Sequence, residues 1–258
     1  MDDRDLWKAA IAEFLGPFAL VVAGVGAVIS TQNLGDGGNL VAVALAHGLA
    51  IALMAAALGA ISGGHFNPAV SVAMLATGNV APVRAGVYIV SQLLGAVAGA
   101  GLLTLVFPAL GEIGRNNVGV NLGVPGLGPD VTVVGGVVFE AVMTFFLVLV
   151  IFGTAVDARG PKAIAPLMIG LTITMDIIFG GRITGAAMNP ARAFGPELVQ
   201  QDFTNWWIYW IGPIAGGLIA AFLYSILWLK PAGPAVAAPA ARASVAASTS
   251  PQPQPQPL

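Results

Sequence analysis

Six long apolar runs constrain this chain more than any other feature of its sequence. A hydrocarbon core of about 30 Å is crossed by a helix of roughly 20 apolar residues. Hydrophobic residues make up 57% of the 258 residues and charged residues only 9%, far from the composition of soluble globular domains. The runs predict spanning helices near residues 7–29, 40–61, 83–107, 131–156, 163–179 and 206–229. We therefore interpret the chain as an all-α membrane protein.

The start of the chain predicts that the first span is retained. The opening "MDDRDLWKAAIAEF" is acidic and places Glu13 inside the first apolar run, whereas a cleaved signal peptide needs a basic start and a small-residue cleavage site. Cytoplasmic connections of membrane proteins carry an excess of Lys and Arg. With both termini cytoplasmic, seven such residues lie inside and three outside. This charge pattern and the compact connections favour the inner, or plasma, membrane of a bacterium.

The polar side chains exclude several classes of function. The chain has no cysteine, and its two histidines lie too far apart to suggest a metal site. With a net charge of −2 and so few charges, no basic stripe for nucleic acid can form. Neither a Ser/His/Asp order nor a Walker or Rossmann loop is present. We expect no catalytic residue, no cofactor, no metal and no nucleic-acid partner.

Two copies of Asn-Pro-Ala break the apolar pattern. They occur within "SGGHFNPAVS" and "TGAAMNPARAF", and their asparagines lie 122 positions apart. Asn is a favoured residue before a helix and Pro a favoured first helical residue, so each copy predicts the start of a helix. Only about eight helical residues follow each copy, roughly 12 Å, which is enough for half a bilayer. The residues concerned are Asn67, Pro68, Ala69, Asn189, Pro190 and Ala191.

The two halves of the chain repeat each other. Tyr88 and Tyr209 align at an offset of 121, and Glu13 and Glu140 recur early in the first helix of each half. Each half then holds three spans and one half-helix, and an odd number of crossings inverts the second half. We predict six transmembrane helices plus two re-entrant half-helices in an inverted repeat. A membrane domain covers residues 1–229, with repeats at about 6–107 and 131–229, and a disordered Pro/Ala/Gln-rich cytoplasmic tail covers 230–258.

Half-helices that enter from opposite faces would meet near the membrane midplane. An asparagine oxygen that caps its helix leaves the side-chain NH2 free as a donor. The positive ends of both helix dipoles would converge there as well. Arg192 follows Asn189 by three residues, and its insertion cost of roughly 2.5 to 3.5 kcal/mol predicts that it faces water or a partner. The alternative interpretation of the two Asn-Pro-Ala motifs is that they are ordinary helix caps in extramembrane loops. The alternative for Arg192 is an arginine that reaches the membrane interface.

The two Asn-Pro-Ala motifs in an inverted six-span repeat resemble the aquaporin, or major intrinsic protein, family over residues 6–229. The resemblance implies a passive channel for water and small neutral solutes, a homotetramer in the lipid bilayer, and one pore in each subunit. It also implies that Glu13 and Glu140 are buried structural acids that bind the re-entrant loops, and that His65 lies at the pore edge. The implied selectivity filter is His47, Ile177, Ala186 and Arg192.

This filter departs from the family's strict water pattern, which has an aromatic residue and a histidine at its first two positions. It is similar to the filter of the plant vacuolar (tonoplast-like) subgroup, and the water branch is also indicated by Ala193, where the glycerol branch has an acidic residue. Ile177 and Ala186 imply a wider and less polar opening. Ammonia, hydrogen peroxide or urea could then accompany water while protons and ions are excluded.

Two other functions remain open from the sequence. A glycerol or urea facilitator of the same family would also suit a wide filter. A secondary transporter of another class can likewise use inverted repeats and broken helices, but it needs a coupling site and a moving half. An intramembrane carboxylate such as Glu13 or Glu140 can also serve in a proton relay.

Overall fold

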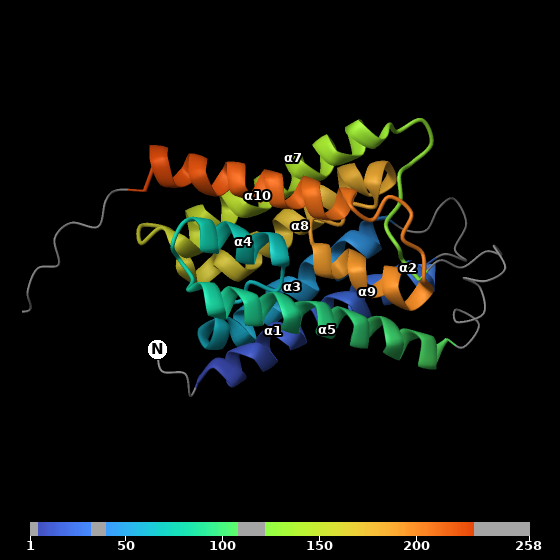
Figure 1. Cartoon of the computed structure of the whole chain (residues 1–258), viewed down its shortest axis with the longest axis horizontal. Coiled ribbons are helices and arrows are strands. Elements are labelled where there is room, and N and C mark those ends of the chain that lie inside the picture. Colours follow the sequence, from blue (N-terminus) through green and yellow to red (C-terminus); the bar gives the residue numbers. More distant parts are fainter. Residues whose placement is uncertain (1–4, 32–39, 108–121, 230–258) are drawn as a thin grey trace, which may run out of the picture.

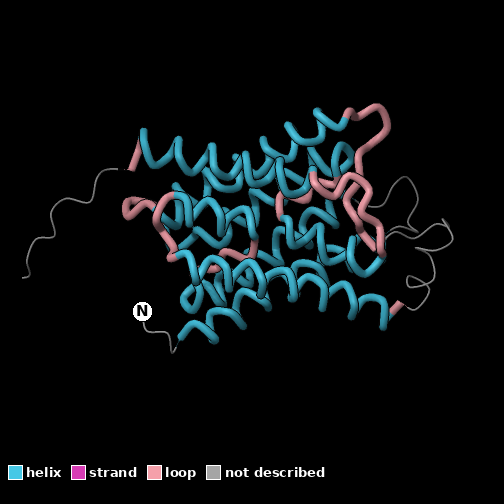
Figure 2. The backbone as a smooth tube through the Cα atoms, viewed as in Figure 1, coloured by secondary structure: helices cyan, strands magenta, loops and turns pink. Residues whose placement is uncertain are grey.

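The computed structural model describes residues 5–31, 40–107 and 122–229, and within these ranges it consists of helices joined by loops, with no strand. Six helices are long and apolar enough to cross a membrane, which confirms the predicted fold class (Figures 1 and 2). They are Leu6–Thr31, Leu40–Ser62, Pro82–Val106, Val133–Val156, Lys162–Thr184 and Ile208–Leu227. The predicted disordered tail at 230–258 lies outside the described residues.

Two of the spans contain a turn of π-helix. The first span consists of α1 (Leu6–Leu20), the π turn η2 (Val21–Val25) and α2 (Gly26–Thr31). The fourth consists of α7 (Val133–Ile151) and the π turn η3 (Phe152–Val156), and the fifth of the short 3-10 helix η4 (Lys162–Ile164) and α8 (Ala165–Thr184). The others are α3 (Leu40–Ser62), α5 (Pro82–Val106) and α10 (Ile208–Leu227).

Two short helices lie inside the bundle, and neither is long enough to span it. Helix α4 (Pro68–Ala76) packs against α5 and α10, and helix α9 (Pro190–Gln200) packs mainly against α5. Figure 1 shows α4 in the half of the molecule near the N-terminus and α9 in the opposite half. The described chain begins and ends at the same end of the bundle, as an even number of crossings requires.

The fifth spanning helix is longer than the sequence indicated. It was expected to end near residue 179, where "FGGRIT" reads as a glycine-rich approach to the second motif, but it continues to Thr184. Its C-terminus is set by Gly185, which adopts a left-handed conformation with φ of 84°. Gly180 remains helical and allows close packing, since a Cβ there would lie 3.2 Å from Cε of Met143 and closer still to its sulfur.

Glycines at matched positions allow the spanning helices to cross closely. A Cβ added to Gly95 would lie 2.9 Å from the Phe14 carbonyl carbon and closer still to its oxygen, which fixes the contact of α5 with α1. The equivalent contact of α10 with α7 is made by Gly216, whose Cβ would lie 2.6 Å from the Ala141 carbonyl carbon. Small residues at helix crossings are the usual means of close association in membranes.

We expect Gly95→Ala to destabilise the protein by about 1–3 kcal/mol, because the added methyl group must push α5 away from a backbone carbonyl. Gly101→Ala in the same helix is the matched control, since a Cβ there meets no described atom within 4 Å. Thermal denaturation of both purified variants measures the difference. Equal melting temperatures for the two variants would contradict the close crossing.

Candidate functional site

The two short helices begin at asparagines that cap them in the same way. Asn67 and Asn189 both have extended backbone and are each followed by Pro at the first helical position. The Asn67 side-chain oxygen accepts a hydrogen bond from the Ala69 N–H at 2.8 Å. The Asn189 oxygen accepts from the Ala191 N–H at 3.0 Å and from the Arg192 N–H at 3.3 Å. Each asparagine therefore satisfies backbone donors that a helix start leaves unpaired.

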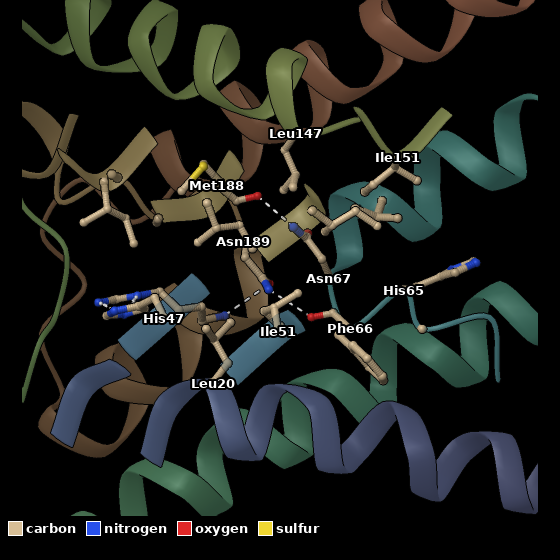
Figure 3. A pocket seen from close by; sticks show the side chains of 18 residues that line it. Leu20, His47, Ile51, His65, Phe66, Asn67, Leu147, Ile151, Met188 and Asn189 are labelled. Atoms are coloured by element: carbon tan, nitrogen blue, oxygen red, sulfur yellow. Dashed lines mark hydrogen bonds between the residues drawn. The ribbon is translucent and has the colours of Figure 1, made fainter. Parts of the chain in front are cut away.

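The side-chain nitrogens of the two asparagines reach across to the opposite half of the molecule. Asn67 Nδ2 donates to the Met188 carbonyl at 2.9 Å, and Asn189 Nδ2 donates to the Phe66 carbonyl, also at 2.9 Å (Figure 3). Each NH2 group, which the sequence predicts to be free as a donor, thus binds a carbonyl of the opposite loop. Each amide carries two N–H groups, so one binds the opposite loop and one is left for a ligand in the cavity.

The segments before the two helices have an unusual backbone. Phe66 and Met188, each one residue before its asparagine, have φ of 50° and 51°, and Ala186 has φ of 45°. Residues other than glycine rarely adopt such values, and the strain persists only where the surroundings fix it. These two stretches are the re-entrant loops, residues 63–66 and 185–188.

Glu13 fixes the first re-entrant loop. Its carboxylate accepts hydrogen bonds from the backbone N–H groups of His65 at 2.9 Å and Phe66 at 2.7 Å. The Ser62 hydroxyl donates to it at 2.6 Å, and the Gln92 amide at 2.7 Å. Glu13 is fully buried, so these four donors replace the water that a carboxylate otherwise binds.

Glu140 fixes the second loop through the same geometry. It accepts from the N–H groups of Ala187 at 2.9 Å and Met188 at 2.7 Å, and from the Thr184 hydroxyl at 2.6 Å. Ala187 and Met188 stand 122 positions after their counterparts in the first loop, as Thr184 does after Ser62. The inverted repeat thus extends to individual hydrogen bonds.

Two tyrosines and a glutamine complete this support, and the sequence alone predicts no role for the glutamine. The Tyr88 hydroxyl donates to the Ser62 carbonyl at 2.6 Å, and the Tyr209 hydroxyl donates to the Thr184 carbonyl at 3.0 Å. The matched offset of the two tyrosines was the sequence signal that could have predicted that both hydroxyls bind equivalent backbone carbonyls. Gln92 also donates to the Ser71 hydroxyl at 3.0 Å, and this contact belongs to the first half alone, since Pro213 stands at the equivalent place.

A narrow cavity of about 30 Å³ runs between the loops and the spanning helices. Its polar wall is formed by residues 64–67 and 186–189, and Figure 3 shows both asparagines pointing toward it. Its apolar wall consists of Leu20, Ile51, Val70, Leu147, Ile151, Ile169 and Ile173. A cavity holds a water molecule from about 10–15 Å³ upward, so this one suits a few waters but no bulky solute.

A second, wider cavity of about 380 Å³ opens at one end of the narrow one. His47, Ile177 and Arg192 line both cavities and therefore mark the boundary between them. Ala186 lines the narrow cavity beside them. The structure thus brings together the four residues predicted for the filter, although they come from α3, α8, the second loop and α9.

The Arg192 guanidinium is buried and held by neutral acceptors. Its Nη1 donates to the Gly123 carbonyl at 2.7 Å, and its Nη2 and Nε lie 3.3 and 3.4 Å from His47 Nε2. His47 Nδ1 lies 2.8 Å from the Val43 carbonyl, which can only accept, so Nδ1 carries the proton and Nε2 offers its lone pair to Arg192. Within residues 5–31, 40–107 and 122–229, no carboxylate pairs with Arg192.

His65 lies at the other end of the narrow cavity, away from His47 (Figure 3). Its Nδ1 is 3.1 Å from the Ser71 hydroxyl, and its ring meets the edge of Tyr88 with centroids 5.1 Å apart. Two further acids are buried elsewhere: Asp176 and Glu197 have no hydrogen-bond partner for their carboxyl oxygens in the described part of the chain. Nothing in the structure explains these two acids.

Six spanning helices around a narrow cavity, with two half-helices meeting inside it, define an integral multi-pass membrane channel. The sequence profile described as Major intrinsic protein matches residues 1–224. The chain belongs to this family.

Individual relatives agree with this assignment. The chain is 39% identical over 237 residues to "Aquaporin TIP4-4" of Zea mays, with 90% of each chain covered. It is 40% identical over 233 residues to "Aquaporin-4" of Mus musculus, covering 86% of this chain and 68% of the relative. Among solved structures, the aquaglyceroporin from Plasmodium falciparum superposes with a TM-score of 0.77 at 26% identity, covering 86% of this chain and 96% of that one.

Proposed function

We propose that this protein is a passive water channel that also passes ammonia, hydrogen peroxide or urea and excludes protons and ions. The observation that carries the proposal is the narrow cavity that joins the four filter residues to Asn67 and Asn189. Its relatives from Zea mays and Mus musculus are named aquaporins. We propose no enzymatic activity and no cofactor.

Water crosses the narrow cavity in single file. On the polar wall, the second N–H of Asn67 and of Asn189 donates to a water oxygen midway, and loop carbonyls accept from water before and after that point. The aliphatic wall offers no hydrogen bond, so each water binds on one side only. A water that accepts from the two asparagines points both of its own hydrogens away from the midpoint, which interrupts a continuous proton-conducting chain.

Positive charge excludes cations at two places, as is general for aquaporin-type channels. The starts of α4 and α9 each bring a partial positive charge of roughly half an elementary charge to the middle of the cavity. Arg192 adds a full charge at the boundary with the wider cavity. Its acceptors Gly123 and His47 are neutral, and no direct ion pair among the described residues cancels that charge.

The filter composition sets which neutral solutes accompany water. His47 and Arg192 supply polar groups on one side, whereas Ile177 and Ala186 supply only apolar surface on the other. With apolar surface on one side, fewer polar groups of the filter need a hydrogen-bond partner. A solute a little larger or less polar than water, such as ammonia, can then pass without leaving many of these groups unpaired.

We expect Ile177→His to lower ammonia permeability by about tenfold or more while water permeability falls much less, because the imidazole narrows the opening and makes it more polar. Ile177→Leu keeps the volume and is the matched control. Stopped-flow measurements on proteoliposomes, with an ammonium gradient and an osmotic gradient, give both values. Equal decreases in water and ammonia permeability would show that Ile177 does not determine selectivity in the filter.

A glycerol or urea facilitator is the alternative that the sequence leaves open, and one solved structure that this chain resembles is an aquaglyceroporin, from Plasmodium falciparum. The narrow cavity of about 30 Å³ argues against glycerol as the main solute. Re-swelling of proteoliposomes in external glycerol as fast as the initial shrinkage would favour the facilitator.

We further propose the assembly and setting of the channel. The family resemblance favours a homotetramer in the lipid bilayer, and the surplus of basic residues favours cytoplasmic termini. We also keep the domain organisation predicted above, with repeats at 6–107 and 131–229. The two relatives named aquaporins come from a plant and a mammal, and the proposal of a bacterial inner membrane is supported by the charge pattern and the compact connections.

A further inference from the structure

Gly24 lies directly behind the imidazole of His47. It is a buried residue of the π turn η2 (Val21–Val25) in the first span. A Cβ built on Gly24 would lie 2.6 Å from Cε1 of His47 and closer still to two other ring atoms. Real Cβ atoms essentially never come this close, so any side chain at residue 24 must displace the ring. Single π turns in α-helices often occur at functional sites.

The surroundings of His47 restrict where the ring can move. Its own helix α3 cannot withdraw, because α8 packs closely behind it: a Cβ on Gly170 would lie 2.7 Å from Cβ of Ala52. His47 lines both the narrow and the wide cavity, so its ring borders open space there. A ring displaced by a methyl group at residue 24 therefore has the passage as open space to enter, and such a movement changes its contacts with Arg192 at 3.3 and 3.4 Å.

The next residue of the same turn supports the other partner of Arg192. Gly123 has φ of +68°, and a Cβ on it would lie 2.9 Å from Cγ1 of Val25. Val25 and Leu122 belong to one buried apolar cluster. The Gly123 carbonyl that accepts from Arg192 at 2.7 Å is thus held against η2. The π turn therefore contacts both groups that position the guanidinium.

We propose that the π turn Val21–Val25 is a positioning element of the filter, and that Gly24 determines specificity by setting how far the His47 ring withdraws from the passage. The inference rests on the proposed function and deepens it. It assigns filter size to a residue of the first span, which supplies none of the four filter side chains.

Four variants test the proposal: Gly24→Ala, Gly26→Ala, His47→Ala, and the double variant Gly24→Ala with His47→Ala. Gly26 is the matched control, since it lies in the same span and a Cβ on it has only Leu103 Cδ2 nearby, at 3.7 Å. We expect Gly24→Ala to lower water permeability by about fivefold or more and ammonia permeability further, because the opening narrows. Gly26→Ala should behave as the unmodified protein.

The double variant separates positioning from a general loss of structure. Removing the imidazole leaves room for the methyl group, so the double variant should match His47→Ala in both permeabilities, a strongly non-additive result. The inference would be overturned if Gly24→Ala lowered water permeability as much in the His47→Ala background as it does alone. It would also be overturned if Gly24→Ala alone left both permeabilities unchanged. If His47→Ala itself changes no solute ratio, the proposed filter fails first, and this inference fails with it.

Discussion

Replacing Glu140 by leucine is expected to leave little or no folded channel. The substitution strands three buried donors, the Thr184 hydroxyl and the N–H groups of Ala187 and Met188. Each unsatisfied buried donor costs about 1–3 kcal/mol, so the sum approaches the whole stability of about 5–15 kcal/mol of an ordinary domain. The strained second loop would also lose the group that fixes it. We expect the yield of monodisperse protein and its melting temperature to fall together.

Glu140→Gln should have an intermediate effect, because one carboxyl oxygen remains as an acceptor while the other becomes a donor that faces existing donors. Glu197 provides the comparison: it is also buried, but its carboxyl oxygens accept no hydrogen bond within the described residues. Glu197→Gln should therefore cost much less than Glu140→Gln. Equal decreases in melting temperature for the two variants would mean that the loss of a buried acid, and not the release of the loop, causes the destabilisation.

Replacing Arg192 by valine should open the channel to protons. Three described residues line both cavities, His47, Ile177 and Arg192, and of these the Arg192 guanidinium alone carries a full charge. Its acceptors face space that water can fill once it is removed. We expect proton flux to rise by about tenfold or more while water permeability stays within about threefold of its starting value. Proton flux is measured with a pH-sensitive dye enclosed in proteoliposomes, and water flux by light scattering on the same preparation.

Arg182→Val is the matched control for this experiment. Arg182 lines the wide cavity but not the narrow one. Its replacement by valine therefore removes the same charge outside the constriction. Proton flux through this variant should stay close to that of the unmodified channel. A similar rise in both variants would attribute proton exclusion to the overall field of the outer cavity and not to the filter.

Much of this fold follows from the physics of a chain in lipid. The length and spacing of the apolar runs predicted all six spans, since a helix without enough apolar residues cannot cross the hydrocarbon core. Asn followed by Pro predicted both half-helix starts, because that pair is favoured at a helix start. The fifth span was misjudged at its end, because Gly180 and Gly181 read as a loop when a close contact with a neighbouring helix was the reason for glycine.

The parts of the site that the sequence did not predict are contacts between distant elements. Nothing local to Asn67 or Asn189 indicates that each donates to the loop of the other half. Likewise, Gln92 reaches Glu13 across 79 positions, and the carbonyl that holds Arg192 belongs to Gly123, a glycine among many. Such partners depend on how helices pack in three dimensions, which hydropathy and capping rules do not specify. Repeat offsets did carry information, since Glu13 and Glu140 pair with equivalent loop residues.

The measurement that tests the central claim most directly is osmotic shrinkage of proteoliposomes followed by stopped-flow light scattering. An impermeant osmolyte should cause shrinkage much faster than in protein-free liposomes, with a low activation energy, because water moves through a preformed passage. Re-swelling under glycerol should be slow. Shrinkage no faster than in protein-free liposomes, from protein that is demonstrably folded, would contradict an open water channel.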